Sequence, residues 1–394
     1  MPRVFAHINP MMLVWAREQR GFDRITAAKK IGIAPEKLAA CEDPADDAEL
    51  TIPQLRNASK TYQRPMALFY LREPPPTPKK LPDFRRLPEN IDSPLSPELR
   101  LEIRKIQEKR KAAVDLVDYG PQFDWSWVGS ISLNDDPEEV GQNIRHLLGI
   151  DESLQRSRKK DHYAALRGWR IAMESVGALV FQISGIALEE MRGFCIAEEP
   201  YPALAVNRKD PPQARCFSVV HEFCHVMLGE SGLSDLSDTA YLGSDRAGQI
   251  EQFCNHAAGA ALVPADVLLD APEVANHGRD SHWEESDLRD LARFFCVSVE
   301  AVLRRLLVLN RTSQSFYRSM RQEWAERPKP EKPSGPVPEK GYEKVIRTQG
   351  SAYARLILEA LHGDAITAGS ASEYLDMKMK HLPALEQAVL VGNG

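Results

Sequence analysis

Two proline-rich stretches limit most strongly how this 394-residue chain can fold, because proline interrupts helices and sheets alike. The first reads REPPPTPKKLPDFRRLP over residues 72–88, and the second reads ERPKPEKPSGPVPEKG over residues 326–341. Such sequences favour stiff, extended connectors. They separate a helical N-terminal segment, a long central part and a short helical tail, in line with the two or three modules that this length predicts.

These breaks predict five regions. In chain order they are an N-terminal domain (1–73), a connector with a linking helix (74–135), a main domain (136–325), a second linker (326–342) and a small helical module (343–394). The main domain begins with helical patterns and continues with three short apolar segments that Gly and Pro separate. We interpret these segments, 177–183, 192–196 and 203–207, as strands. Helical patterns follow at 215–229 and 249–262, so we expect a mostly helical α+β fold.

Composition excludes several classes of protein. The net charge of -6 argues against nonspecific coating of nucleic acid or anionic membrane. No apolar run approaches the ~20 residues that span a bilayer, so we expect no membrane partner. The six cysteines have no CxxC spacing and are expected to be reduced, mostly buried thiols of a cytoplasmic protein. They are Cys41, Cys195, Cys216, Cys224, Cys254 and Cys296.

Residues 221–225 have the sequence HEFCH, which is of the form HExxH. A helix advances about 100° per residue, so His221 and His225 lie one turn apart on the same face. Both imidazoles can then reach one Zn²⁺ at about 2.0–2.1 Å. Glu222 lies at the flank of that face, where it can act on a metal-bound water as the catalytic base without ligating the metal.

Two histidines do not complete a catalytic zinc site, which usually takes three protein ligands. The next helical segment, IEQFCNHAAGAALVP, offers Glu251 as the third ligand. Asn255 follows one turn later and is expected to orient that carboxylate through a hydrogen bond. His256 points away from Glu251 and is interpreted as a packing or surface histidine. For Cys224 we expect a small packed thiol, with a sulfur ligand as the alternative.

These parts predict a zinc endopeptidase, because zinc polarises a carbonyl and Glu222 can take a proton from water. We expect ALAVN (203–207) to be an edge strand that pairs with an extended peptide substrate. Two alternatives stay open. The zinc domain can be a binding module that cleaves nothing, or the chain can be a helical scaffold without metal.

Residues 10–71 predict a bundle of about five short helices. Ala28, Gly32 and Leu38 have the spacing of a helix-turn-helix, with a small residue for close contact, a glycine for the turn and an apolar core residue. The candidate DNA contacts are Arg24, Lys29, Glu36 and Lys37, with Arg20 and Lys30 as further cations. Residues 1–73 hold eleven Lys and Arg against nine Asp and Glu, a net of +2. A protein-interaction bundle is therefore the alternative to DNA binding.

Several of these segments together resemble a known family. INPMMLVWAREQRGF and AAKKIGIAPEKLAA are similar to the Xre-type helix-turn-helix domains found fused to ImmA/IrrE-family metallopeptidases. The resemblance continues through RPMALFYLREPPP, LPDFRRLP, MRGF, HEFCH and IEQFCNHAAGAALVP, and so covers nearly the full length.

The resemblance implies a zincin-like domain whose third ligand comes from the second helix, at Glu251. It also implies a regulator that binds operator DNA, often as the antitoxin-like or stress-responsive half of a two-gene system. The partner protein would then be a toxin or a repressor, as ligand or as substrate. From the helix-turn-helix pattern we expect a homodimer that reads two half-sites.

Overall fold

The computed structural model describes residues 4–75, 95–151, 161–234, 245–277, 281–327 and 340–391. Most of both proline-rich stretches lies outside these residues. The chain divides into two structural units, the first formed by residues 1–80 with 92–107 and the second by 81–91 with 108–394. The boundary between them falls within helix α5 (Pro97–Asp115).

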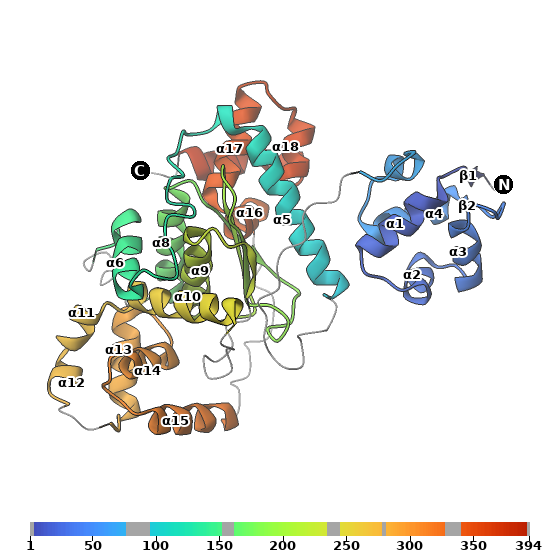
Figure 1. Cartoon of the computed structure of the whole chain (residues 1–394). Helices are drawn as coiled ribbons and strands as arrows, with labels where there is room; N and C mark the ends of the chain where they lie inside the picture. Colours follow the sequence, from blue (N-terminus) through green and yellow to red (C-terminus); the bar gives the residue numbers. More distant parts are fainter. Residues whose placement is uncertain are drawn as a thin grey trace. The chain divides into compact units, whose positions relative to one another are not determined.

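The first unit is a small helical bundle with one short two-stranded sheet (Figure 1). Its elements are β1 (Phe5–Ala6), α1 (Pro10–Gln19), α2 (Arg24–Ile31), α3 (Pro35–Glu42), β2 (Leu50–Thr51), α4 (Ile52–Tyr62) and the 3-10 turn η1 (Met66–Tyr70). The side chain of Asp23 accepts a hydrogen bond from the Thr26 amide and so caps α2. Gly32 ends α2 at a φ of 83°, which a residue with a side chain rarely adopts, and Pro35 begins α3.

The second unit contains the remaining helices and a four-stranded sheet. Its first elements, up to the helix that follows the last strand, are η2 (Val117–Tyr119), α6 (Pro137–Leu147), α8 (His162–Glu174), β3 (Leu179–Ile183), β4 (Gly193–Ile196), β5 (Ala203–Asn207), α9 (Pro212–Met227), β6 (Gly232–Ser234) and α10 (Arg246–Leu262). Those that follow are α11 (Ala265–Leu269), α12 (Pro272–Ala275), α13 (Glu285–Phe295), α14 (Val299–Val308) and α15 (Gln314–Glu326). The order confirms the prediction of helices, a small sheet and then helices.

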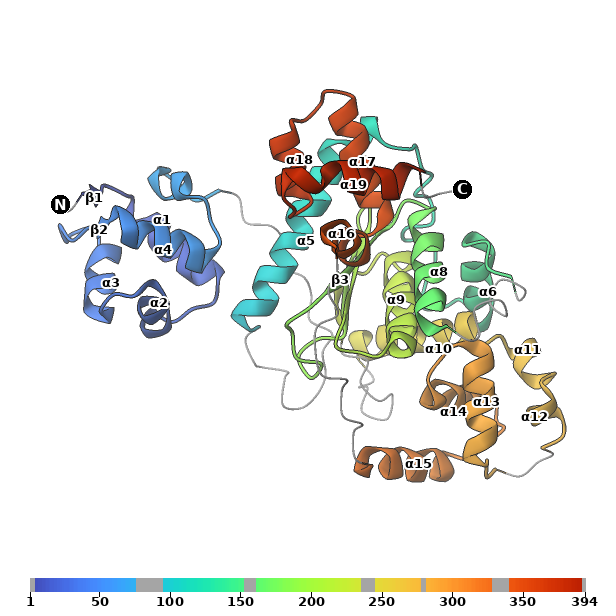
Figure 2. The ribbon, with the colours of Figure 1, turned by 180° about the vertical axis from the view of Figure 1, so that it is seen from behind.

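The tail forms α16 (Gly341–Gln349), α17 (Ser351–His362), α18 (Ala368–Tyr374), η4 (Met379–His381), α19 (Leu382–Glu386) and a last turn, η5 (Gln387–Val391). It belongs to the second unit, in which α16 packs against β3 (Figure 2). Arg170 and Gln182 both donate to the backbone carbonyl of Arg347. These contacts attach the tail to α8 and to the edge of the sheet.

The sheet has the order β3-β5-β4-β6. β5 pairs in parallel with β3, and β4 pairs antiparallel with both β5 and β6. The prediction that residues 203–207 form an edge strand is therefore wrong. All five of these residues are buried, and a short apolar run without alternation is typical of a strand that is covered on both faces.

Helix α9 lies in the middle of the second unit, where it contacts α8, β4, β5 and α10 (Figure 2). Each residue from 218 to 227 is buried. Phe223 stacks on Trp127 with ring centroids 4.6 Å apart. This burial agrees with the apolar residues on both sides of HEFCH, and it places the two histidines inside the core.

Candidate metal centre

The two histidines of α9 and Glu251 of α10 meet at one point in the core. The Nε2 atoms of His221 and His225 lie 3.0 Å apart. Oε2 of Glu251 lies 3.2 Å from Nε2 of His221, and Oε1 lies 3.1 Å from Nε2 of His225. The three side chains come together because the histidines are one turn apart and α10 packs directly on α9. Among the described residues this is the group whose ligand atoms suit a metal ion.

The donor set and its spacing fit zinc. Two imidazole nitrogens and a carboxylate oxygen are ligands that Zn²⁺ prefers. Ligands that are 2.0–2.1 Å from a tetrahedral ion lie about 3.3–3.4 Å apart, which is close to the distances found here. His221 and His225 are fully buried and Glu251 is 2% exposed. Such a cluster can hold a cation that offsets the burial of the carboxylate charge.

The protonation states of His221 and Glu251 suit a metal. Burial lowers the pKa of His221, which keeps its imidazole neutral. Burial alone would raise the pKa of Glu251, but the two histidines and their hydrogen bonds lower it to about 2. At His225 the effect of burial is outweighed by the carboxylates of Glu251 and Glu222, so the pKa is raised. A neutral imidazole and an ionised carboxylate are the forms that ligate zinc.

Glu222 lies next to the cluster and is fully buried. Its side chain packs against the backbone of Gly193 in β4. A methyl group at Gly193 would stand 3.0 Å from both Cγ and Cδ of Glu222 and closer still to Oε1. Sequence reasoning did not assign a role to Gly193, although a glycine inside a strand is a known signal of close approach.

The hydrogen bond expected from Asn255 to Glu251 is absent among the described residues. Asn255 is buried, with 4% of its surface exposed, and neither amide atom has a partner among the described residues. The two oxygens of Glu251 lie close to the imidazoles of His221 and His225. Helical spacing alone could not show where the amide of Asn255 points.

Two further residues near the cluster, His256 and Cys224, do not belong to it. Nε2 of His256 lies 2.7 Å from Oε1 of Glu138, so this histidine joins α10 to α6. Cys224 is buried and is not part of the metal cluster among the described residues. All six cysteines are buried and none forms a disulfide, as predicted.

The candidate DNA contacts lie on or beside α2 and α3. Lys29 and Glu36 are exposed. Nε of Arg24 donates to Glu42 at 3.0 Å, and Nζ of Lys37 donates to Gln54 at 3.1 Å. Arg20 is 6% exposed, so the expectation that it is available to phosphate is wrong.

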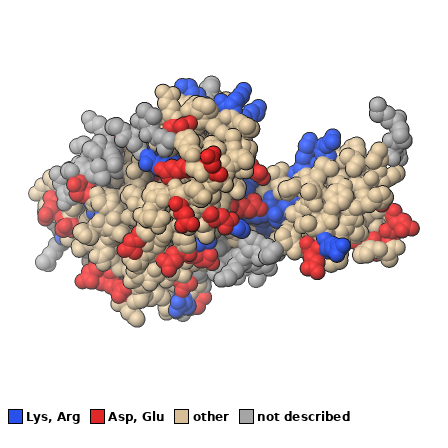
Figure 3. Space-filling view, turned by 90° about the horizontal axis from the view of Figure 1, so that it is seen from above, with Lys and Arg blue, Asp and Glu red and all other residues tan. Residues whose placement is uncertain are grey.

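The charge on this unit is mixed. On the face seen in Figure 3, acidic and basic side chains of the first unit both reach the surface. Any phosphate contact there would compete with nearby carboxylates.

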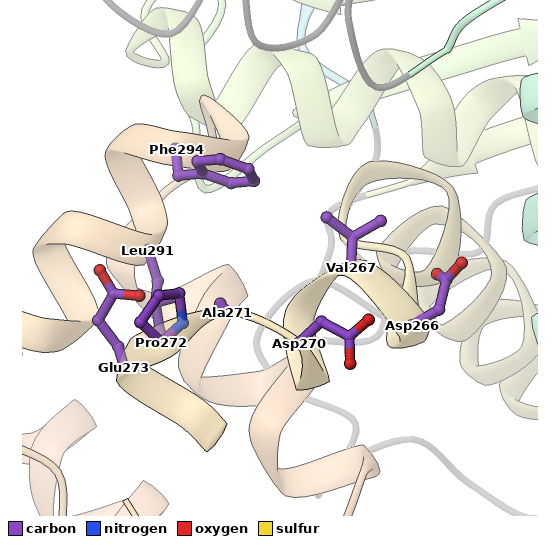
Figure 4. Close-up of a pocket in the computed structure, with 8 residues that line it drawn as sticks. All are labelled: Asp266, Val267, Asp270, Ala271, Pro272, Glu273, Leu291 and Phe294. Atoms are coloured by element: carbon purple, nitrogen blue, oxygen red, sulfur yellow. The ribbon is translucent and has the colours of Figure 1, made fainter. Parts of the chain in front are cut away.

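A separate cavity of about 340 Å³ lies among α11, α12 and α13 (Figure 4). Asp266, Asp270 and Glu273 line it together with Leu291 and Phe294. Figure 4 shows Asp266 and Glu273 on opposite sides, so the carboxylates do not converge on one point. The residues of the metal cluster are not part of its lining.

Fold and site define a metallopeptidase-like domain in the central part of the chain. Residues 174–307, from the end of α8 to the end of α14, match the peptidase family model described as the IrrE N-terminal-like domain. The match includes the whole cluster and Glu222, whereas the first structural unit lies outside it. No curated protein matches the chain. None of the described helices is both long and apolar enough to cross a membrane.

Proposed function

We propose that the central domain is a zinc-dependent endopeptidase in which His221, His225 and Glu251 bind zinc. Glu222 is the general base. The observation that carries this proposal is the buried meeting of two imidazole nitrogens and one carboxylate, with a second buried carboxylate beside them. The family match over residues 174–307 supports the same chemistry.

Zinc bound there would polarise a peptide carbonyl and lower the pKa of a water molecule toward about 7. Glu222 takes the proton of the attacking water and delivers it to the leaving amine. Because Glu251 and the histidines fill three ligand positions, the carboxylate of Glu222 is left to move the proton. Its burial keeps bulk water from competing for that proton.

Metal analysis tests the ligand assignment. We expect about one zinc per chain in the purified parent protein and its loss in His221→Ala, since two ligands hold zinc poorly. His146→Ala is the control, because His146 is exposed and lies outside the cluster. A His221→Ala protein that retains full zinc occupancy would exclude this ligand set.

Glu222→Gln tests the chemistry separately. The amide cannot accept the proton, so zinc should remain bound while peptide cleavage falls by at least about 10²-fold. The substrate can be found by screening a peptide library with the zinc-loaded protein. Cleavage at the parent rate by Glu222→Gln would show that this residue is not the base.

The alternative is a regulator or antitoxin whose zinc domain only binds a partner protein. The internal position of β5 favours it, because the strand expected to pair with substrate has no open edge. The effect of Glu222→Gln on regulation distinguishes the peptidase from the binding module. Glu222→Gln abolishes regulation if the domain must cleave its partner, and it leaves regulation intact if the domain only binds.

For the first unit we propose DNA binding by α2 and α3 as a homodimer, in a cytoplasmic regulator whose partner is a toxin or a repressor. The order of α2, the turn at Gly32 and α3 supports this, and the resemblance to Xre-type domains adds to it. Lys29 and Glu36 are exposed and can reach a groove, while Arg24 and Lys37 must leave Glu42 and Gln54 to do so.

Gel-shift titration against the DNA upstream of the protein's own gene tests this proposal. Because few cations are free, affinity should fall with salt less steeply than for a strongly basic repressor. Lys29→Ala and Lys37→Ala should weaken binding to all sequences, and Lys60→Ala on α4 should not. Glu36→Ala should change base preference if the carboxylate meets a cytosine amino group. The absence of any sequence-selective shift at low salt favours a protein-interaction bundle.

A further inference from the structure

A second cavity, of about 260 Å³, lies where the tail packs on the central domain. Its walls come from the loop at 121–123, from α8, from the start of β3 and from the first turns of α17. The metal cluster does not line it. A buried apolar cavity of about 150 Å³ already accepts benzene, so this volume suits a molecule of one or two rings.

Tyr201 is one of the residues that line this cavity. Tyr201 is 3% exposed, and none of the described residues bonds to its hydroxyl. Its ring is held by Trp125 and Phe123, at centroid distances of 5.3 and 6.3 Å. Burial, with a contribution from Glu359, raises the pKa of Tyr201 to about 12, so the hydroxyl stays a donor. Buried hydroxyls nearly always have a partner, and its absence points to a group that a ligand supplies.

The lining of the cavity also includes one cation, Arg355 of α17. Nη2 of Arg355 reaches the carbonyl of Val389 at 3.3 Å, and no described carboxylate forms an ion pair with this guanidinium. Glu359, one turn further along α17, interacts electrostatically with Arg355 but is not part of the lining. The remaining walls are mainly apolar, with Phe123 and Leu356 among them.

The carboxylate in the lining is already engaged. Glu174 accepts hydrogen bonds from the amide and hydroxyl of Ser351 and from the amide of Ala352. It therefore does not offer a site for a ligand cation. The polar groups open to a ligand are the guanidinium and the phenol, and both favour an anionic acceptor.

We propose that this cavity binds a small aromatic carboxylate, with its ring between Phe123 and Leu356 and its carboxylate on Arg355 and Tyr201. Such a ligand contacts both α17 and the loop at 121–123. It therefore links the tail to the domain that carries the metal cluster. This binding does not depend on peptidase activity.

Calorimetric titration of the full-length protein with indole-3-carboxylate, and with indole as the neutral match, tests the proposal. We expect the carboxylate to bind about 10-fold more tightly than indole, since hydrogen bonds to charged groups are the stronger ones. Arg355→Gln should remove this difference, and Tyr201→Phe should weaken carboxylate binding about 5-fold. Tyr163→Phe, an exposed tyrosine outside the cavity, is the control and should bind as the parent does.

Thermal melts show whether each variant is folded and whether the ligand raises its Tm. Tyr201→Phe removes an unsatisfied hydroxyl and should fold at least as stably as the parent. Ala352→Leu narrows the cavity with no polar change and should abolish the rise in Tm that the ligand causes. The proposal is overturned if indole-3-carboxylate does not bind at millimolar concentration. It is equally overturned if Arg355→Gln, Tyr201→Phe and Ala352→Leu all bind it as tightly as the parent.

Discussion

At the scale of single residues, the absence of a side chain at Gly193 matters as much as the groups around it. Gly193 lies in β4, paired with Val206 on one side and Ser234 on the other, so its backbone is fixed by the sheet. Glu222 is fixed by its own helix and fully buried. Neither residue can move far, and a Cβ at Gly193 would occupy space that the carboxylate of Glu222 now fills.

Gly193→Ala should therefore displace the carboxylate of Glu222 while the zinc ligands keep their places. A displacement of about 1 Å at a catalytic group can cost about 10²-fold in rate, so we expect that loss in peptide cleavage with normal zinc content. Gly259→Ala on α10 is the matched control. A methyl group there meets no atom within 4 Å and should add about 0.5–1 kcal/mol of stability to the helix. Parent activity in Gly193→Ala would show that the contact does not position Glu222.

At the scale of elements, one carboxylate joins three helices. Glu138 in the first turn of α6 forms two short hydrogen bonds with Arg305 of α14 and one with His256 of α10. Arg305 is 2% exposed and also donates to the carbonyl of Val263. A buried guanidinium without its carboxylate is costly, so this network holds α6, α10 and α14 together.

The network makes stability depend on pH. The hydrogen bonds of Arg305 lower the pKa of Glu138 below its ordinary value of 4.5, against the opposing effect of burial. A lowered pKa in the folded state stabilises the protein above pH 4.5, and this contribution is lost as the pH falls through the folded-state pKa. Glu138→Gln should cost on the order of 2 kcal/mol in urea unfolding at pH 7 and much less at pH 3. Glu139→Gln, in the same turn but exposed, should change little at either pH.

The sequence predicts where helices and strands lie better than it predicts which elements pack or pair with one another. Helical spacing placed the histidines of α9 on one face, and helical patterns with Gly and Pro breaks located α10 and three strands. Strand order depends on pairing between distant segments, and so the internal position of β5 and the short strand β6 were not foreseen. The same limit applies to side-chain direction, since spacing could not show that the amide of Asn255 has no hydrogen-bond partner among the described residues. Tyr201 and Arg355 are far apart in the sequence, and only the fold brings them to one cavity.

At the scale of the whole molecule, the tail is part of the second structural unit. Helix α17 has no side-chain cap of its own, because Gly350 occupies the capping position. The carboxylate of Glu174, from α8, takes that role by accepting from Ser351 and Ala352. A negative charge at a helix N-terminus also interacts favourably with the helix dipole. The start of α17 is thus completed by the domain that carries the metal cluster.

Glu174→Ala should therefore loosen the tail selectively. Glu174 is 6% exposed and accepts three hydrogen bonds from α17, whose loss we expect to cost about 2–3 kcal/mol because the orphaned donors are partly buried. Hydrogen exchange of the full chain should show faster exchange in α16 and α17 and unchanged exchange in α9 and α10. Glu373→Ala on α18 is the control, since Glu373 is exposed and belongs to the same tail. Unchanged protection of α17 in Glu174→Ala would mean that apolar packing alone holds the tail. Faster exchange spread evenly over the second unit would mean that tail and central domain unfold as one cooperative body.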